Sequence, residues 1–227
     1  MMIRLLGLSL AATAGLSMAA NAAPEHQRLR GIVSAVSASE LTVHTATGDV
    51  AMSLGSDTKY LTVGHSDLDH ITADSYIGAA TKDVGGKQVA LDVLIFPPAM
   101  KGAAEGHFGW DSLPDTTQDG KPRTASSMTN GSVAAVKRGS AATNSSMTNG
   151  SVTTASERGG ARQLTVTYKG GEQMILVPPT APVVTLQFGT ASDIKPGDGV
   201  FVNAVSDDGK TAAGLVIVGT DGAVPPI

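Results

Sequence analysis

Two stretches of the chain show the same order of apolar and polar segments. The run RLRGIVSAVSASELTVHTATGDVAMSL, which starts at Arg28, combines a Gly-x-Val strand pattern, a Leu-Thr-Val pattern and a glycine turn. The run SMTNGSVTTASERGGARQLTVTYKGGEQMILV, which starts at Ser146, repeats these features in the same order and matches Gly150 to Gly31. Self-similarity of this kind indicates that the chain contains two related modules.

The similarity extends beyond these two runs. SDLDHITADSYIGAAT in the first half aligns with TASDIKPGDGVFVNAV in the second, and DVGGKQVALDVLIF aligns with SDDGKTAAGLVIVG. We therefore predict a first module over 23–98 and a second module over 145–227. The Gly-, Pro- and Ser-rich segment 99–144 is predicted to be an irregular linker between them.

Each module has the pattern of β structure. ELTVHTA and RQLTVTY alternate apolar and polar residues and are rich in Thr and Val, and short Gly-containing turns follow them. Ser66-x-x-Asp69 and Thr190-x-x-Asp193 resemble capping boxes and predict one helical turn between the third and fourth of five strands. This pattern favours an all-β protein of two tandem OB-like (oligonucleotide/oligosaccharide-binding) Greek-key barrels. An immunoglobulin-like sandwich is the alternative, although it usually requires more strands.

The segment SSMTNGSV occurs twice, at 126–133 and at 145–152. Only the second copy runs directly into the Leu-Thr-Val strand, so we predict that it forms the first strand of the second module. The first copy would then be a surplus edge strand or a loop. Because the side chains are identical, the two copies could compete for one position, since register is weakly specified in polar strands.

The N-terminus has the features of a secretory signal. Arg4 precedes an apolar run that is too short to span a bilayer, and the run closes with Ala20-Asn21-Ala22, which fits the small-x-small rule for cleavage. We expect a signal peptide over 1–22, cleavage near Ala22 and a soluble periplasmic or secreted protein. A retained membrane anchor is the alternative.

Composition narrows the classes of partner. Aromatic residues make up 4% of the chain and the formal net charge is −4, which disfavours nucleic acids and anionic membranes as partners. Cysteine is absent, so disulfides and thiol chemistry are excluded.

No motif predicts catalysis. The chain lacks a Gly-x-Ser-x-Gly elbow, and DDGKT at 207–211 ends like a phosphate loop but has the pattern of a hairpin turn. We expect no catalytic residue and no cofactor. An enzyme acting on cell-envelope material is the least supported function.

The stretch FPPAMKGAAEGHFGWD, at 96–111, allows two interpretations. In the first, its apolar side chains are anchors that fix the relative orientation of the modules. In the second, Glu105, His107 and Asp111 converge with Met100 as a metal or ligand site in the cleft between the modules. Weaker candidate ligands are His65 and His70 in GHSDLDH, whose spacing matches no established zinc signature.

The same stretch resembles part of a known family. The run Phe-Pro-x-x-Met-x-Gly-x-x-Glu-Gly-His-x-x-Trp-Asp, followed by Met-Thr-Asn-Gly and later by LTVTYKGGEQ, is similar to exported bacterial proteins with paired OB-like domains of unknown function. Members are sometimes labelled metal ABC transporter permease. The present chain does not fit that label, because a permease requires several membrane-spanning helices. The resemblance implies an architecture but no activity.

These observations favour a non-enzymatic binding or scaffolding protein with a protein, peptide or glycan partner in the envelope. The alternative is a soluble metal-binding accessory protein of an envelope transport or stress system.

Overall fold

A computed structural model describes residues 23–118, 122–138 and 160–225, and within these ranges the regular structure consists of β-strands and short 3₁₀ turns. The strands are β1 (Glu25–Val36), β2 (Glu40–Thr45), β3 (Gly48–Ser66), β4 (Tyr76–Val84), β5 (Lys87–Ile95), β6 (Gly106–Gly109), β7 (Leu113–Pro114), β8 (Arg123–Thr124), β9 (Ser127–Arg138), β10 (Arg162–Tyr168), β11 (Gly171–Val177), β12 (Val183–Phe188), β13 (Gly199–Asp207) and β14 (Lys210–Gly219). The 3₁₀ turns are η1 (Leu68–His70), η2 (Pro98–Met100) and η3 (Ala191–Asp193). The predicted all-β class is confirmed.

Most strands belong to one mixed sheet. Its order is β11-β10-β9-β4-β5-β12-β3-β14-β13-β1-β2, and β6 pairs with β9 outside this path. Additional pairings join β2 to β3 and β11 to β5, so each end of the sheet curls back on itself. β7 and β8 form a separate two-stranded sheet.

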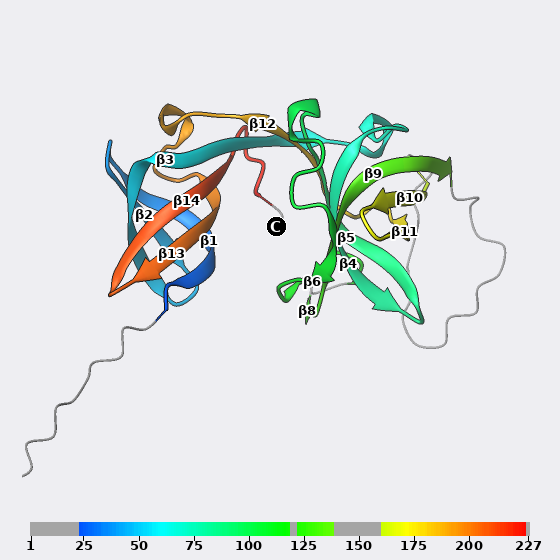
Figure 1. Cartoon of the computed structure of the whole chain (residues 1–227), viewed down its shortest axis with the longest axis horizontal. Helices are drawn as coiled ribbons and strands as arrows, with labels where there is room; N and C mark the ends of the chain where they lie inside the picture. The colour runs from blue at the N-terminus through cyan, green and yellow to red at the C-terminus, as the bar shows by residue number, and fades with distance from the viewer. Residues whose placement is uncertain (1–22, 119–121, 139–159, 226–227) are drawn as a thin grey trace, which may run out of the picture.

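The curled sheet forms two lobes (Figure 1). The first lobe consists of β1, β2, β3, β13 and β14, and the second lobe consists of β4, β5, β9, β10 and β11. Each lobe therefore combines strands from both halves of the sequence: β1 pairs with β13, and β9 pairs with β4. This corrects the predicted tandem arrangement, because the modules 23–98 and 145–227 exchange their last two strands.

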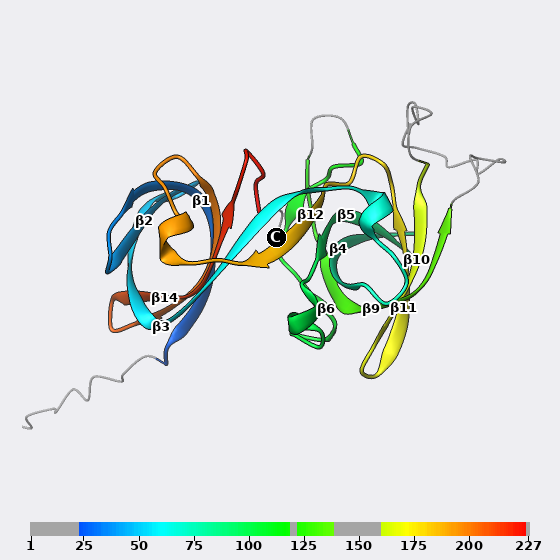
Figure 2. The same cartoon turned by 90° about the horizontal axis from the view of Figure 1, so that it is seen from above.

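The exchange runs through β3 and β12, which cross side by side from one lobe to the other (Figure 2). A 3₁₀ turn follows each crossing strand. η1 lies between the third and fourth strands of the first repeat, as predicted, and η3 lies between β12 and β13, the fourth and fifth strands of the second repeat. Thr190 and Asp193 form the predicted capping box. At η1 the cap is instead Asp67, whose carboxylate accepts from the backbone N–H groups of Asp69 and His70, so the predicted role of Ser66 is wrong.

Each lobe encloses its own apolar core. Ile194, just after η3, packs into the core of the first lobe, and Ile71, just after η1, packs into that of the second. A third apolar cluster combines side chains of both lobes and of the crossing strands. Its buried members are Leu61, Val63, Leu94, Val184, Leu186, Phe201, Ile217 and Ala223. This cluster joins the two lobes.

Segment 99–144 is not the irregular linker that composition predicts. Its described residues include β6, β7, β8 and β9, and β9 is a full member of the second lobe. β9 begins within the first SSMTNGSV copy, and Val133 from that copy is fully buried in the core of this lobe. The prediction that the first copy is surplus is therefore wrong. The second copy, 145–152, and the expected signal peptide, 1–22, lie outside the described residues.

Within the described residues, the structure contains no helix with the length and apolarity needed to span a membrane.

An arginine cleft between the lobes as the candidate functional site

β1 and β9 occupy equivalent places in the two lobes, and their glycines establish the alignment. A Cβ added to Gly31 would lie 2.1 Å from the carbonyl oxygen of His44, and one added to Gly131 would lie 2.4 Å from that of Thr167. Both oxygens belong to the next strand of the same lobe. Gly31 therefore corresponds to Gly131 of the first copy, and not to Gly150 as the sequence alignment indicated.

This alignment exposes a difference between the strands. Arg28 and Arg30 of β1 correspond to Met128 and Asn130 of β9, which are buried. The same backbone thus tolerates an apolar or a neutral side chain where β1 carries two guanidinium groups. The fold alone does not require arginine at these positions, and this singles them out as candidates for function.

Both arginines hold the carboxylate of Asp111, which follows β6. Arg28 donates from Nη2 (2.7 Å) and Nε (3.0 Å) to Oδ1 of Asp111, and Arg30 donates from Nη1 to Oδ2 at 2.7 Å. The Arg28 guanidinium also lies over the ring of Trp110, 4.2 Å from its centre. Stacking and ion pairing together fix the plane of the Arg28 guanidinium.

These contacts set the charge state of Asp111. Partial burial favours a higher pKa, but the hydrogen bonds and charges of Arg28 and Arg30 outweigh it and hold the pKa of Asp111 below its usual value. The carboxylate is therefore ionised at neutral pH.

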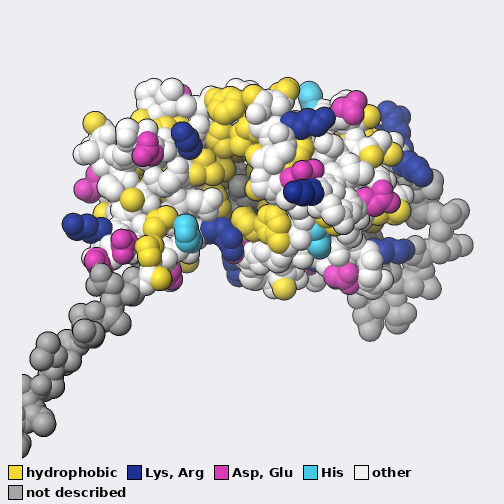
Figure 3. Space-filling model, in the orientation of Figure 1, with side chains coloured by type: hydrophobic (Ala, Val, Ile, Leu, Met, Phe, Trp, Pro, Cys, Tyr) yellow, Lys and Arg dark blue, Asp and Glu magenta, His cyan; other side chains and the backbone are white. Residues whose placement is uncertain are grey.

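The arginines open into a cavity of about 670 Å³ between the two lobes, here called the arginine cleft. Its lining residues are His26, Gln27, Arg28, Arg30, Asp111, Arg123, Asn203 and Ala204. Among the described residues of this lining, three are arginines and one is an aspartate. Figure 3 shows basic side chains beside hydrophobic side chains in the space between the lobes. A concentration of positive charge in a chain of net charge −4 creates a local site for anions.

A buried carboxyl group lies near the same arginines. Asp92 of β5 is 4% exposed, and burial raises its pKa to about 8 despite a backbone hydrogen bond and the charge of Arg30. Among the described residues its Oδ1 has no hydrogen-bond partner. The corresponding residue of the second repeat is Leu215, since Asp92 pairs with Ala80 and Leu215 pairs with Asn203 beside matching bulges. Asp92 is thus a second polar departure from the repeat.

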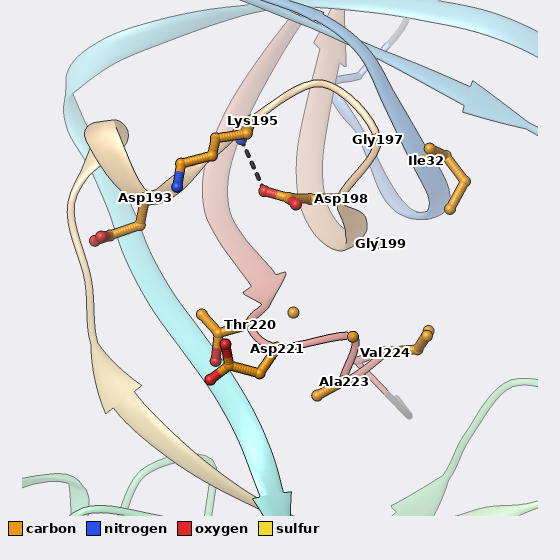
Figure 4. Close-up of a pocket in the computed structure, with 12 residues that line it drawn as sticks. Ile32, Asp193, Lys195, Gly197, Asp198, Gly199, Thr220, Asp221, Ala223 and Val224 are labelled. Carbon is orange, nitrogen blue, oxygen red and sulfur yellow. Dashed lines mark hydrogen bonds between the residues drawn. The ribbon is translucent and has the colours of Figure 1, made fainter.

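A second cavity of about 390 Å³ lies where η3 and the residues after β14 approach β1 (Figure 4). Two of its three aspartates stabilise their own loops: Asp198 accepts from the backbone N–H of Lys195 at 2.8 Å, and Asp193 caps η3. Much of the remaining lining is glycine backbone. The arginine cleft, which carries the two arginines that the repeated fold does not require, is the stronger candidate.

The structure does not bring the predicted metal ligands of segment 96–111 together. Asp111 is engaged by two arginines. The exposed His107 has Nδ1 2.9 Å from Oγ1 of Thr129 and its ring stacks on Tyr168. Glu105 is exposed, and its charge adds to burial in raising the pKa of Tyr76.

The weaker candidates are separate from these residues in the fold. His65 is exposed on β3, and His70 is exposed in η1, with Nδ1 2.8 Å from Oδ1 of Asp67. In the described part of the chain, no group of three or more His, Cys, Asp or Glu side chains could hold a metal ion. Metal binding stays a prediction that no geometry here supports.

The packing of segment 96–111 agrees with the interpretation that its apolar side chains are anchors. Phe96, Met100 and Trp110 pack against the cluster that joins the lobes, as an anchoring role requires. Phe108 is 38% exposed and contacts the edge of Trp110. The segment therefore packs where the two lobes join, and Asp111 at its end lines the arginine cleft.

Sequence reasoning missed Arg28, Arg30 and Asp92. The signal was available in the repeat, because an alignment through Gly131 places Met128 and Asn130 opposite Arg28 and Arg30, and the alignment of DVGGKQVALDVLIF with SDDGKTAAGLVIVG already places Leu215 opposite Asp92. Alignment through the wrong SSMTNGSV copy concealed the difference on β1.

Comparison of the chain with family models, curated proteins and solved structures finds no match. The resemblance to exported proteins with paired OB-like domains therefore stays a prediction from its motifs.

Proposed function

We propose that this chain is an exported, non-enzymatic binding protein of the periplasm that takes up its ligand in the arginine cleft. The observation that carries the proposal is the pair Arg28 and Arg30, which the repeated fold does not require and which line a cavity between the lobes. Sites between domains or lobes are common places for ligands, and a cavity of this size is typical of them.

We further propose that each lobe is an OB-like barrel completed by strands of the other repeat. Support comes from the five-strand composition of each lobe, from the parallel pairing of β3 with β14, and from the 3₁₀ turn that precedes the last two strands of each repeat. Because the lobes exchange strands, neither repeat forms its own core, and the cleft keeps a fixed geometry. A preorganised cleft suits binding.

Export supports an envelope ligand and rests on the predicted signal peptide. The test is cell fractionation followed by N-terminal sequencing of the protein. We expect a periplasmic form that begins at Ala23; a cytoplasmic form that retains residues 1–22 would contradict export.

Binding is tested by thermal shift of the mature protein against purified envelope components, namely peptidoglycan fragments, acidic and neutral oligosaccharides and short peptides. We expect at least one component to stabilise the protein in a way that Arg123→Gln weakens. Conversion of any component into a product, or equal stabilisation of both proteins by every component, would overturn the proposal.

A further inference from the structure

We infer that the ligand of the arginine cleft is an acidic saccharide, bound through its carboxylate or phosphate groups. This inference deepens the proposed binding function and depends on it. It is carried by the kinds of side chain that line the cleft and by the contacts that orient them.

The charge of the cleft selects anions. Arg28 and Arg123 line it with two guanidinium groups, beside the ion pair of Arg30 with Asp111. Guanidinium groups bind carboxylates and phosphates through paired hydrogen bonds, which makes arginine the side chain most suited to both groups. An anionic ligand would therefore pair with the exposed guanidinium groups of Arg28 and Arg123.

The orientation of Arg28 leaves part of its guanidinium available. Asp111 engages Nε and Nη2 of Arg28, and the ring of Trp110 supports one face. Among the described residues, Nη1 of Arg28 forms no hydrogen bond, and the side chain is 40% exposed. Asp111 thus acts as a carboxylate that positions the arginine while a second anion approaches from the cleft.

The neutral lining favours a saccharide over other anions. Asn203, exposed on β13 opposite Arg28, carries an amide group, which both donates and accepts hydrogen bonds and so suits the hydroxyl groups of a sugar. One face of the Trp110 ring is covered by the Arg28 guanidinium, so this face offers no platform for a nucleobase. The cavity volume of about 670 Å³ accommodates a short oligosaccharide.

The test is isothermal titration of the mature protein with trigalacturonate, with its methyl ester and with inorganic phosphate. The ester keeps the scaffold and removes the charges, so it is the matched neutral ligand. We expect trigalacturonate to bind at least ten-fold more tightly than the ester and than inorganic phosphate. Glucose 6-phosphate beside glucose gives the same comparison for a sugar phosphate and distinguishes the two anionic groups.

Two variants locate the site. Arg123→Gln removes an exposed cleft charge, and Arg28→Lys keeps the charge but loses the paired geometry; each is expected to weaken binding at least five-fold. Lys169→Gln, in the β10–β11 hairpin, removes the same charge far from the cleft and is expected to bind like the parent. Circular dichroism and the melting temperature show whether each variant is folded.

The inference is overturned if neither acidic saccharide binds more tightly than its neutral counterpart, if inorganic phosphate binds as tightly as both, or if Lys169→Gln weakens binding as much as Arg123→Gln. A neutral peptide or saccharide that binds and requires Arg123 would overturn the acidic ligand while leaving the proposed binding function intact. Failure of every component in the thermal-shift panel would overturn both.

Discussion

β1 and β9 are the same strand of the fold in two different settings. Both have a glycine pressed against a carbonyl oxygen of the next strand, and both place a fully buried valine, Val33 or Val133, two residues later. They differ just before the glycine, where β1 carries Arg28 and Arg30 and β9 carries neutral side chains. The shared positions reveal what the fold requires, and the differing positions reveal what one lobe adds to it.

β5 and β14 also occupy equivalent places in the two lobes and differ by one polar residue. Asp92 in β5 and Leu215 in β14 occupy matching positions beside matching bulges, and only Asp92 introduces a carboxyl group into the contact region. Burying this carboxyl group has an energetic cost that a leucine would avoid. Arg28, Arg30 and Asp92, the polar residues by which the first repeat differs from the second, all lie where the two lobes meet.

If β1 and β9 are equivalent, substituting Gly31 or Gly131 should cause the largest loss in the free energy of unfolding. Gly31→Ala and Gly131→Ala each place a Cβ against a backbone carbonyl at 2.1 and 2.4 Å. We expect each change to lower the free energy of unfolding by about 5 kcal/mol or more, comparable with the whole stability of many domains. Urea denaturation measures this. Gly55→Ala, with nothing within 4 Å, is the control; a tolerated Gly131→Ala would break the equivalence.

Asp92→Asn tests the buried carboxyl group through pH. The folded pKa of Asp92, about 8, lies above the reference value of 3.8. The stability that Asp92 contributes is therefore fully present below pH 3.8 and is lost as the pH rises through 8. Relative to the parent, the variant should gain about 3–5 kcal/mol between pH 4 and pH 8.

Melting temperatures of both proteins across this pH range measure the gain. Asp92→Leu, which copies the residue of the second repeat, should show the same pH dependence relative to the parent. If the difference in melting temperature between the parent and Asp92→Asn stayed constant from pH 4 to pH 8, Asp92 would have an ordinary pKa.

Val133→Ala asks which SSMTNGSV copy forms β9. Val133 is fully buried, so the change should lower the free energy of unfolding by about 2 kcal/mol. The same substitution at Val152, the matching position of the second copy, completes the comparison by urea denaturation. A larger loss at Val152 than at Val133 would show that the second copy forms the strand.

Asp111→Asn should give the smallest effect on stability. The pKa of Asp111 lies below 3.8, so its contribution is present above that pH and is lost as the pH falls through the folded pKa. Since its side chain is 25% exposed, we expect a loss of about 1 kcal/mol at pH 7 that is smaller at pH 3. Thermal unfolding at the two pH values checks it; an equal loss at both would exclude an ionic origin.

The sequence predicted the local structure well because local structure follows local patterns. Alternating Thr and Val marked the strands, and the Thr190–Asp193 box marked η3. The exchange of strands between repeats was not predicted, because the strand pattern of a repeat is the same whether its last two strands pair within it or with the other repeat. Only the tertiary structure distinguishes β1 paired with β13 from β1 paired with β4.

The candidate site was predicted in part. Asp111 was identified from its motif, but as a metal ligand, because its partners Arg28 and Arg30 lie about eighty positions earlier in the chain. Ion pairs of such separation leave no trace in local spacing. In the sequence, Asp92 has the pattern of an ordinary polar residue in an apolar strand, and only the tertiary structure shows that its side chain is buried.

The most direct test of the account follows the arginine side chains themselves. Nitrogen-15 spectra of the Nε–Hε groups of the mature protein, recorded at pH 6 during titration with trigalacturonate, report each guanidinium separately. The account predicts saturable shifts of Arg28 and Arg123, none of Arg138 and Arg162 in the second lobe, and none with the methyl ester. Shifts confined to Arg138 or Arg162, or none at any arginine, would contradict a ligand site between the lobes.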